Sequence, residues 1–149
     1  MHIRLFYTYG AGQTHNSLIN QLFKASLSVD DISLSPCEHF RDYIHVSDAA
    51  EGISELATID YTGIINLGSG NVIKLKEFVK LFWKACKADP SLLKFGQHDL
   101  SALEQSQPKS FANISKLINI SSWKPSIKIE EGIEKTVAQM HDMFDIADQ

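Results

Sequence analysis

The chain has 149 residues, 44% of them hydrophobic, and a formal net charge of −4. This acidic balance argues against a nucleic-acid partner, which requires a concentrated basic face. No apolar stretch approaches the roughly 20 residues of a membrane span, and no signal-like segment precedes the first predicted strand. The sequence therefore predicts a cytoplasmic protein without a membrane partner. Cys37 and Cys86 lack metal-site or redox-motif spacing and are predicted to be reduced thiols.

Strands and helices are predicted to alternate along the first half of the chain. Branched and aromatic residues predict strands, and apolar residues at intervals of three and four predict helices. In chain order we expect a strand over residues 3–9, a helix over 18–23, an extended piece at 32–34 and a strand over 40–46. Ser47 and Asp48 are placed to cap the next helix, which is expected to extend to residue 57.

The second half continues this alternation. We expect a short apolar strand within 63–70, an amphipathic helix over 75–86, an extended piece at 92–95, a short helix after Asn113 and a last helix over 129–144. Residues 98–108 are polar and irregular, which is typical of a mobile loop. With no repeats or linkers, residues 1–149 are predicted to form a single α/β unit.

The strand at 40–46 carries the most informative side chains. Alternation places Arg41, Tyr43 and His45 on one face. A permanent cation beside an aromatic ring suits a phosphate with its attached ribose or base. This segment therefore predicts a nucleotide-binding strand. His45 fits a packed strand histidine better than a catalytic one, because no nucleophile or carboxylate partner is suggested nearby.

Five segments, in order, resemble one family. Residues 41–48 are similar to its Arg-Asp-(Phe/Tyr)-x-His-Val-x-Asp motif, and residues 4–13 resemble its sixth sheet strand and following loop. Residues 65–70, 112–116 and 123–133 resemble its later strand-turn and closing segments. The family is that of the NAD-dependent epimerases and dehydratases of nucleotide sugars, within the extended short-chain dehydrogenase/reductases. UDP-galactose 4-epimerase is a familiar member.

This resemblance implies a partial protein. Family members begin with a Rossmann half that carries a glycine-rich pyrophosphate loop and a catalytic Tyr-x-x-x-Lys pair. Neither occurs in these 149 residues, so we expect no catalytic residue here and no NAD or NADP bound to this chain alone. The implied fold is α/β: the last two parallel strands of a Rossmann-type sheet plus a small, mostly helical substrate-binding lobe. The implied activity of the full enzyme is epimerisation, dehydration or reduction of a nucleotide sugar with NAD or NADP.

The resemblance also assigns the substrate-binding residues. Arg41 is expected to bind phosphate, with Tyr43 along the nucleotide and Leu75 against the base. An ordinary surface arginine, a half-buried strand tyrosine and a core leucine are the alternatives. Tyr7 stands where the family usually has an asparagine that reaches the phosphates. The family's second phosphate-binding arginine is absent from 103–108, and Lys109 is the candidate to replace its charge.

Two functions and one assembly state follow as predictions. The first function is the substrate-binding portion of a nucleotide-sugar enzyme, with a nucleotide-diphosphate sugar as its ligand. The alternative is a non-catalytic nucleotide-sugar-binding or assembly module derived from that family, which the departures at Tyr7 and 103–108 support. The strand at 3–9 would pair on one side with the absent half, so alone it exposes an apolar edge, and we predict a homodimer.

Overall fold

The computed structural model describes residues 1–99, 105 and 109–147, and for 145–147 the backbone only. Strands that form parallel pairs alternate with helices along the chain, which confirms the predicted α/β class. The strands are β1 (His2–Leu5), β2 (Tyr7–Tyr9), β3 (Ile32–Leu34), β4 (Phe40–Arg41), β5 (Tyr43–His45), β6 (Ile64–Leu67), β7 (Ile73–Lys74), β8 (Leu93–Phe95) and β9 (Lys109–Ser110). The helices are α1 (Leu18–Ser26), α2 (Val46–Ala57), α3 (Leu75–Ala85), α5 (Ser115–Ile120) and α6 (Ile129–Ala147), with the 3₁₀ helix η1 (Pro90–Leu92) between α3 and β8.

The predicted first strand is two strands with different partners. β1 pairs in parallel with β6, and β2 pairs in parallel with β5. Phe6 lies between them, and its N–H still donates to the Leu67 carbonyl at 2.9 Å. The predicted strand at 40–46 is likewise divided at Asp42, because β4 pairs with β7 and β9 whereas β5 pairs with β2. β4 is instead the centre of a three-stranded sheet with β7 and β9.

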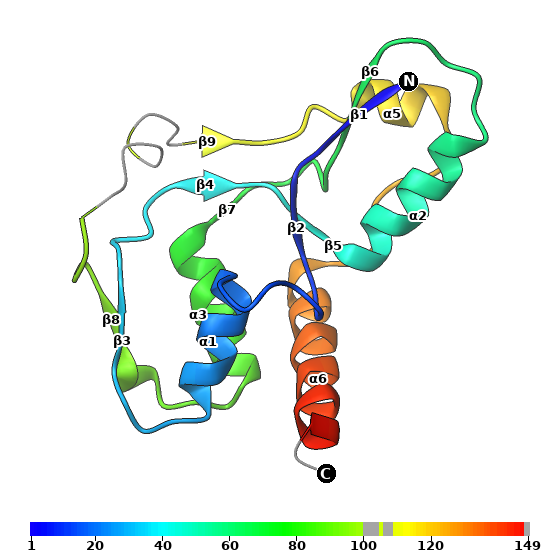
Figure 1. Cartoon of the computed structure of the whole chain (residues 1–149). Coiled ribbons are helices and arrows are strands. Elements are labelled where there is room, and N and C mark those ends of the chain that lie inside the picture. The colour runs from blue at the N-terminus through cyan, green and yellow to red at the C-terminus, as the bar shows by residue number, and fades with distance from the viewer. Residues whose placement is uncertain (100–104, 106–108, 148–149) are drawn as a thin grey trace.

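Two apolar clusters form the core. The larger joins α1, α3 and α6 through Leu22, Phe82 and Ile133, and the smaller packs α2 and α5 against β6. Figure 1 shows α1, α3 and α6 gathered in one part of the molecule and α2, α5 and β6 in another, with β2 and β5 between them. The strands that carry Tyr7, Arg41 and Tyr43 therefore lie close to the larger cluster.

The start of α2 differs from the prediction. The helix begins at Val46, and its N-cap is His45 rather than Ser47 or Asp48. The His45 Nδ1 accepts a hydrogen bond from the Ser47 N–H at 3.2 Å. Asp48 lies in the first turn but is buried, and it accepts from the Ser126 and Ile127 N–H groups. Alternation along the strand does not reveal that a buried histidine can provide the cap.

Burial favours the neutral form of His45. Burial lowers its pKa from the ordinary value of 6.5, more strongly than nearby Asp48 raises it. Its Nε2 is buried without a hydrogen-bond partner among the described residues. The Tyr9 ring contacts the imidazole edge to face, with centroids 5.3 Å apart. The structure thus agrees with a packed histidine that terminates β5 and begins α2.

In the part of the chain that the structure describes, no helix combines the length and apolar character needed to cross a bilayer. Of the predicted irregular segment at 98–108, residues 100–104 and 106–108 lie outside the described residues.

Candidate functional site

A cavity of about 340 Å³ opens between β2, α1, β4, β5 and the start of α3. We call it the Arg41 cavity. Its lining is largely aromatic and aliphatic, with one cation and a few polar groups: Tyr7, Thr8, Tyr9, Gln13, Leu18, Ile19, His39, Arg41, Tyr43, Leu75 and Phe78. Four of the five residues assigned from the sequence are in this set. An apolar cleft with a few convergent polar groups is the usual form of a small-molecule site.

Arg41 is not a surface arginine, since only 3% of it is exposed. Its Nη1 donates to the Phe40 carbonyl at 2.8 Å, and its Cζ lies 5.4 Å from the centroid of the Tyr7 ring. A buried guanidinium on a cavity wall provides a planar fork of donors in a region of low dielectric, where an anion is bound more strongly than in water. The wall can therefore bind a phosphate or carboxylate.

Tyr43 joins this wall to the core. Its ring stacks on Phe78 with centroids 4.2 Å apart, while Tyr9 meets Phe78 edge to face. Burial is the main reason that the pKa of Tyr43 is raised, although Arg41 acts in the opposite direction. The phenol therefore stays protonated near neutral pH. The alternative of a half-buried strand tyrosine agrees with its packing, but its place in the cavity lining also makes it available to a ligand.

Leu75 has both of its proposed environments. It is buried as the first residue of α3, and its N–H donates to the His39 carbonyl at 2.9 Å. It also lines the cavity beside Phe78. A core leucine and an apolar wall for a base are thus compatible roles at this position.

Lys109 is the assigned residue that the cavity does not include. In β9 it pairs with Phe40, whereas Ser110 pairs with Arg41. Paired residues share a face of the sheet, so Lys109 lies on the face opposite Arg41. Its Nζ lies 5.4 Å from the Phe111 ring centroid. The segment 103–108, where the family's second arginine would stand, lies outside the described residues except for Gln105.

Asp42, the residue after Arg41, binds the loops next to the site, and sequence reasoning did not identify this role. Its Oδ1 accepts from the N–H and Oγ of Ser69, at 2.7 Å each. Its Oδ2 accepts from the N–H groups of Gly70 and Ala112, at 2.9 and 3.0 Å. The fully buried Asp42 carboxylate thus links two segments to the backbone next to Arg41: the turn after β6 and the segment after β9.

The same hydrogen bonds show whether the glycine-containing turn at residues 68–70 can bind the pyrophosphate of a dinucleotide. A pyrophosphate loop needs free backbone N–H groups, but the Ser69 and Gly70 amides already donate to Asp42, and the Asn71 amide donates to Ser69 Oγ. A Cβ at Gly68 would also overlap that of Ala112. The turn therefore does not fit NAD or NADP. The glycines serve close packing instead.

Sequence reasoning missed other residues of the lining. His39 lies two positions before Arg41, and Gln13 follows the loop after β2. His39 could have been found by extending the alternation of Arg41 and Tyr43 back by two residues. Phe78 was interpreted only as part of a helix core. Gln13 had no such signal, because its position depends on the loop, where its Nε2 donates to the Thr8 carbonyl.

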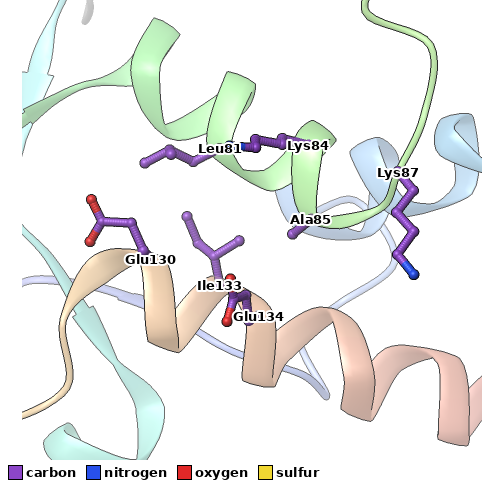
Figure 2. A pocket seen from close by; sticks show the side chains of 7 residues that line it. All are labelled: Leu81, Lys84, Ala85, Lys87, Glu130, Ile133 and Glu134. Atoms are coloured by element: carbon purple, nitrogen blue, oxygen red, sulfur yellow. The ribbon is translucent and has the colours of Figure 1, made fainter.

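A second cavity of similar size, about 340 Å³, lies between α3 and α6 (Figure 2). Figure 2 shows Lys84 on the α3 side and Glu130 and Glu134 on the α6 side, with Ile133 directed toward α3. Its wall charges are of both signs and it has no aromatic lining. It contains none of the residues assigned from the sequence. The Arg41 cavity is therefore the better candidate. Within the described residues no group of acidic, histidine or cysteine side chains could hold a metal ion.

No family model matches the chain. Among curated proteins, it is 34% identical over 101 residues to UDP-glucuronate 4-epimerase of Thermodesulfobacterium geofontis. The aligned region covers 65% of this chain and 29% of the relative. It is 28% identical over 137 residues to UDP-glucuronic acid decarboxylase 6 of Arabidopsis thaliana, which covers 87% of this chain and 37% of that protein.

Solved structures extend this match to nearly the whole chain. The UDP-N-acetylglucosamine 4-epimerase of Methanobrevibacter ruminantium, in complex with UDP-N-acetylmuramic acid, superposes with a TM-score of 0.81 at 26% identity over 95% of this chain and 46% of its own. The chain matches the carboxy-terminal part of NAD-dependent nucleotide-sugar epimerases and dehydratases. The dTDP-glucose 4,6-dehydratase of Bacillus anthracis has the same fold, with a TM-score of 0.82 over 94% of the chain. The chain spans about a third of the length of the two curated relatives and under half of these two structures.

Proposed function

We propose that the Arg41 cavity binds the nucleotide diphosphate of a nucleotide sugar. The observation that carries this proposal is that four residues assigned from the sequence, Arg41, Tyr43, Leu75 and Tyr7, line one cavity. Arg41 supplies a donor fork for phosphate oxygens. The aromatic rings and Leu75 supply apolar surface for the ribose and base.

In this proposal the chain is the substrate-binding portion of an NAD- or NADP-dependent nucleotide-sugar epimerase, dehydratase or reductase. By holding the diphosphate, it fixes where the sugar stands relative to the reacting groups. Those groups, and the residues that bind the dinucleotide, would belong to a Rossmann half outside these 149 residues. The isolated chain is therefore expected to bind a nucleotide sugar and to leave it unchanged.

Calorimetric titration tests the proposal. The purified chain is titrated with UDP-, CDP-, GDP- and dTDP-sugars, and we expect saturable binding of at least one. Arg41→Ala should weaken that binding roughly 10- to 100-fold, since a hydrogen bond to a charged group contributes about 1.5–3 kcal/mol. Lys94→Ala is the matched control, because Lys94 is a partly exposed cation on β8 and is not in the cavity lining. No binding of any of the four nucleotides would contradict the proposal.

The same titration decides the place of Lys109. It is one of the candidate phosphate ligands assigned from the sequence, but it lies on the sheet face opposite Arg41. We expect Lys109→Ala to bind like the unchanged chain. A loss comparable to that of Arg41→Ala would show that Lys109 reaches the ligand.

The alternative function is a non-catalytic nucleotide-sugar-binding or assembly module. The presence of Tyr7 where the resembling family usually has asparagine favours it. Turnover separates the two: if binding is found, the chain is mixed with a Rossmann half from a related epimerase and NAD, and product is sought by chromatography. Restored turnover favours the enzyme portion, and binding without turnover favours the module.

A further inference from the structure

Tyr7 stands between two cavities. One is the Arg41 cavity, and the other, of about 410 Å³, is lined by Arg4, Leu5, Phe6, Tyr7 and Ser110. Tyr7 is an exposed residue, with 42% of its surface accessible. A ring in this position is within reach of a ligand and at the same time packed against protein.

The packing of Tyr7 centres on Arg41. The guanidinium carbon lies 5.4 Å from the ring centroid, inside the range of a cation–π contact. β2 pairs with β5 so that Tyr7 lies opposite Tyr43, and the two rings are 6.0 Å apart and tilted by 58°. Because Tyr43 is itself stacked on Phe78 at 4.2 Å, the Tyr7 ring contacts a side chain that packs against the core.

The contact with the ring restrains the guanidinium through its face. A cation–π contact involves the faces of the ring and the cation and does not itself use the guanidinium N–H groups. One of these groups already donates to the Phe40 carbonyl. Arginine has a long side chain with about 2 kcal/mol of rotamer entropy, so a ring that limits its motion before binding reduces the entropy lost on binding.

We propose that Tyr7 is a positioning residue: its ring holds the Arg41 guanidinium in place for phosphate oxygens. This inference rests on the proposed function, since it names the device by which that site acts. It makes the aromatic ring, rather than the hydroxyl, the part of Tyr7 that matters. It also gives a physical role to the residue at which the sequence departs from the family pattern.

The test compares Tyr7→Phe, which keeps the ring, with Tyr7→Leu, which keeps apolar bulk without it. Titration with UDP should give affinity within about twofold of the unchanged chain for Tyr7→Phe. For Tyr7→Leu it should be about 5- to 30-fold weaker, the range expected for a cation–π contact between partly exposed and desolvated. In an Arg41→Ala background, Tyr7→Leu should have no further effect, because the group that it positions is gone. Urea unfolding of each variant checks that the fold is kept.

The outcomes are distinct. If the unchanged chain binds UDP and Tyr7→Leu binds equally well, the inference is overturned while the proposed function stands. Equal losses in Tyr7→Phe and Tyr7→Leu would assign the effect to the hydroxyl and also overturn it. If the unchanged chain fails to bind UDP and every nucleotide sugar, the proposed function fails and this inference fails with it. Should Tyr7→Leu not fold, Tyr7→Ile replaces it in the same comparison.

Discussion

Replacing Asp42 by asparagine gives the sharpest test of how the site is built. Each carboxylate oxygen accepts two hydrogen bonds, from Ser69 N–H and Oγ on one side and from the Gly70 and Ala112 amides on the other. An asparagine keeps one oxygen, so its NH₂ group faces either the Gly70 and Ala112 amides or Ser69, where the hydroxyl can turn to accept from it and only the Ser69 N–H loses its acceptor. The side chain is fully buried, and water cannot replace the lost acceptor.

The expected loss follows from the one backbone N–H left without an acceptor in the better orientation. At about 1.5–3 kcal/mol for a bond to a charged acceptor, Asp42→Asn should lower the free energy of unfolding by about 1.5–3 kcal/mol. This is a large share of the 5–15 kcal/mol that is ordinary for a domain. The loss would be measured by urea unfolding followed by far-UV circular dichroism, with the m-value compared to show that the transition is unchanged in kind.

Two further variants make this result interpretable. Asp60→Asn is the matched control, because Asp60 is exposed, and it should change the free energy of unfolding by less than about 0.5 kcal/mol. Ser69→Ala removes only one donor to Asp42, and its loss should be about 1 kcal/mol, measurable even if Asp42→Asn does not fold. A free energy for Asp42→Asn within 1 kcal/mol of the unchanged chain would refute the reasoning.

Three other predictions concern the histidine, a helix glycine and the open strand edge. Burial lowers the folded-state pKa of His45 below 6.5, so the unfolded chain takes up the proton first as the pH falls. The urea concentration at the unfolding midpoint should therefore be lower at pH 5.5 than at pH 7.5, and this difference should be smaller in His45→Gln. An equal difference in both proteins would contradict the prediction. Gly132→Ala should destabilise the fold by about 1–3 kcal/mol because the new Cβ overlaps the Tyr9 hydroxyl. Adding Tyr9→Phe should restore part of the lost stability, as chemical denaturation of the single and double variants would show. Among the described residues β1 has a paired strand, β6, on one side only, so we expect light scattering to show a dimer. Leu5→Lys should weaken this dimer, whereas Val29→Lys, at an exposed position remote from β1, should not. A strictly monomeric chain at high concentration would contradict the prediction.

The sequence predicted element types better than their ends and partners. Apolar spacing located α3 and α6, because helix periodicity depends on local contacts with the core. It did not show that the strand at 3–9 divides at Phe6, since that division follows from two different partners, β6 and β5. β7 and β9 were also missed, because strands of two residues have no periodicity.

The same limit applies to the candidate site. Arg41 and Tyr43 could be assigned together because alternation along one strand is local information. Lys109 was assigned by its nearness in sequence to an absent arginine, and only the register of β9 against β4 shows that it faces away from the cavity. Asp42 was hidden for a related reason. Its four donors come from segments 27 to 70 residues away along the chain.

The residues of the segment 41–48 have two kinds of role. Arg41 and Tyr43 line the cavity, whereas Asp42 and Asp48 are buried carboxylates that bind backbone amides of distant loops. The two sets are coupled, since a shift of Asp42 would move the backbone on both sides of it. A variant that disturbs Asp42 should therefore weaken ligand binding as well as the fold, and nucleotide affinity measured on the fraction of Ser69→Ala that remains folded would reveal that coupling. An unchanged affinity would show that the cavity wall keeps its position without the full set of bonds to Asp42.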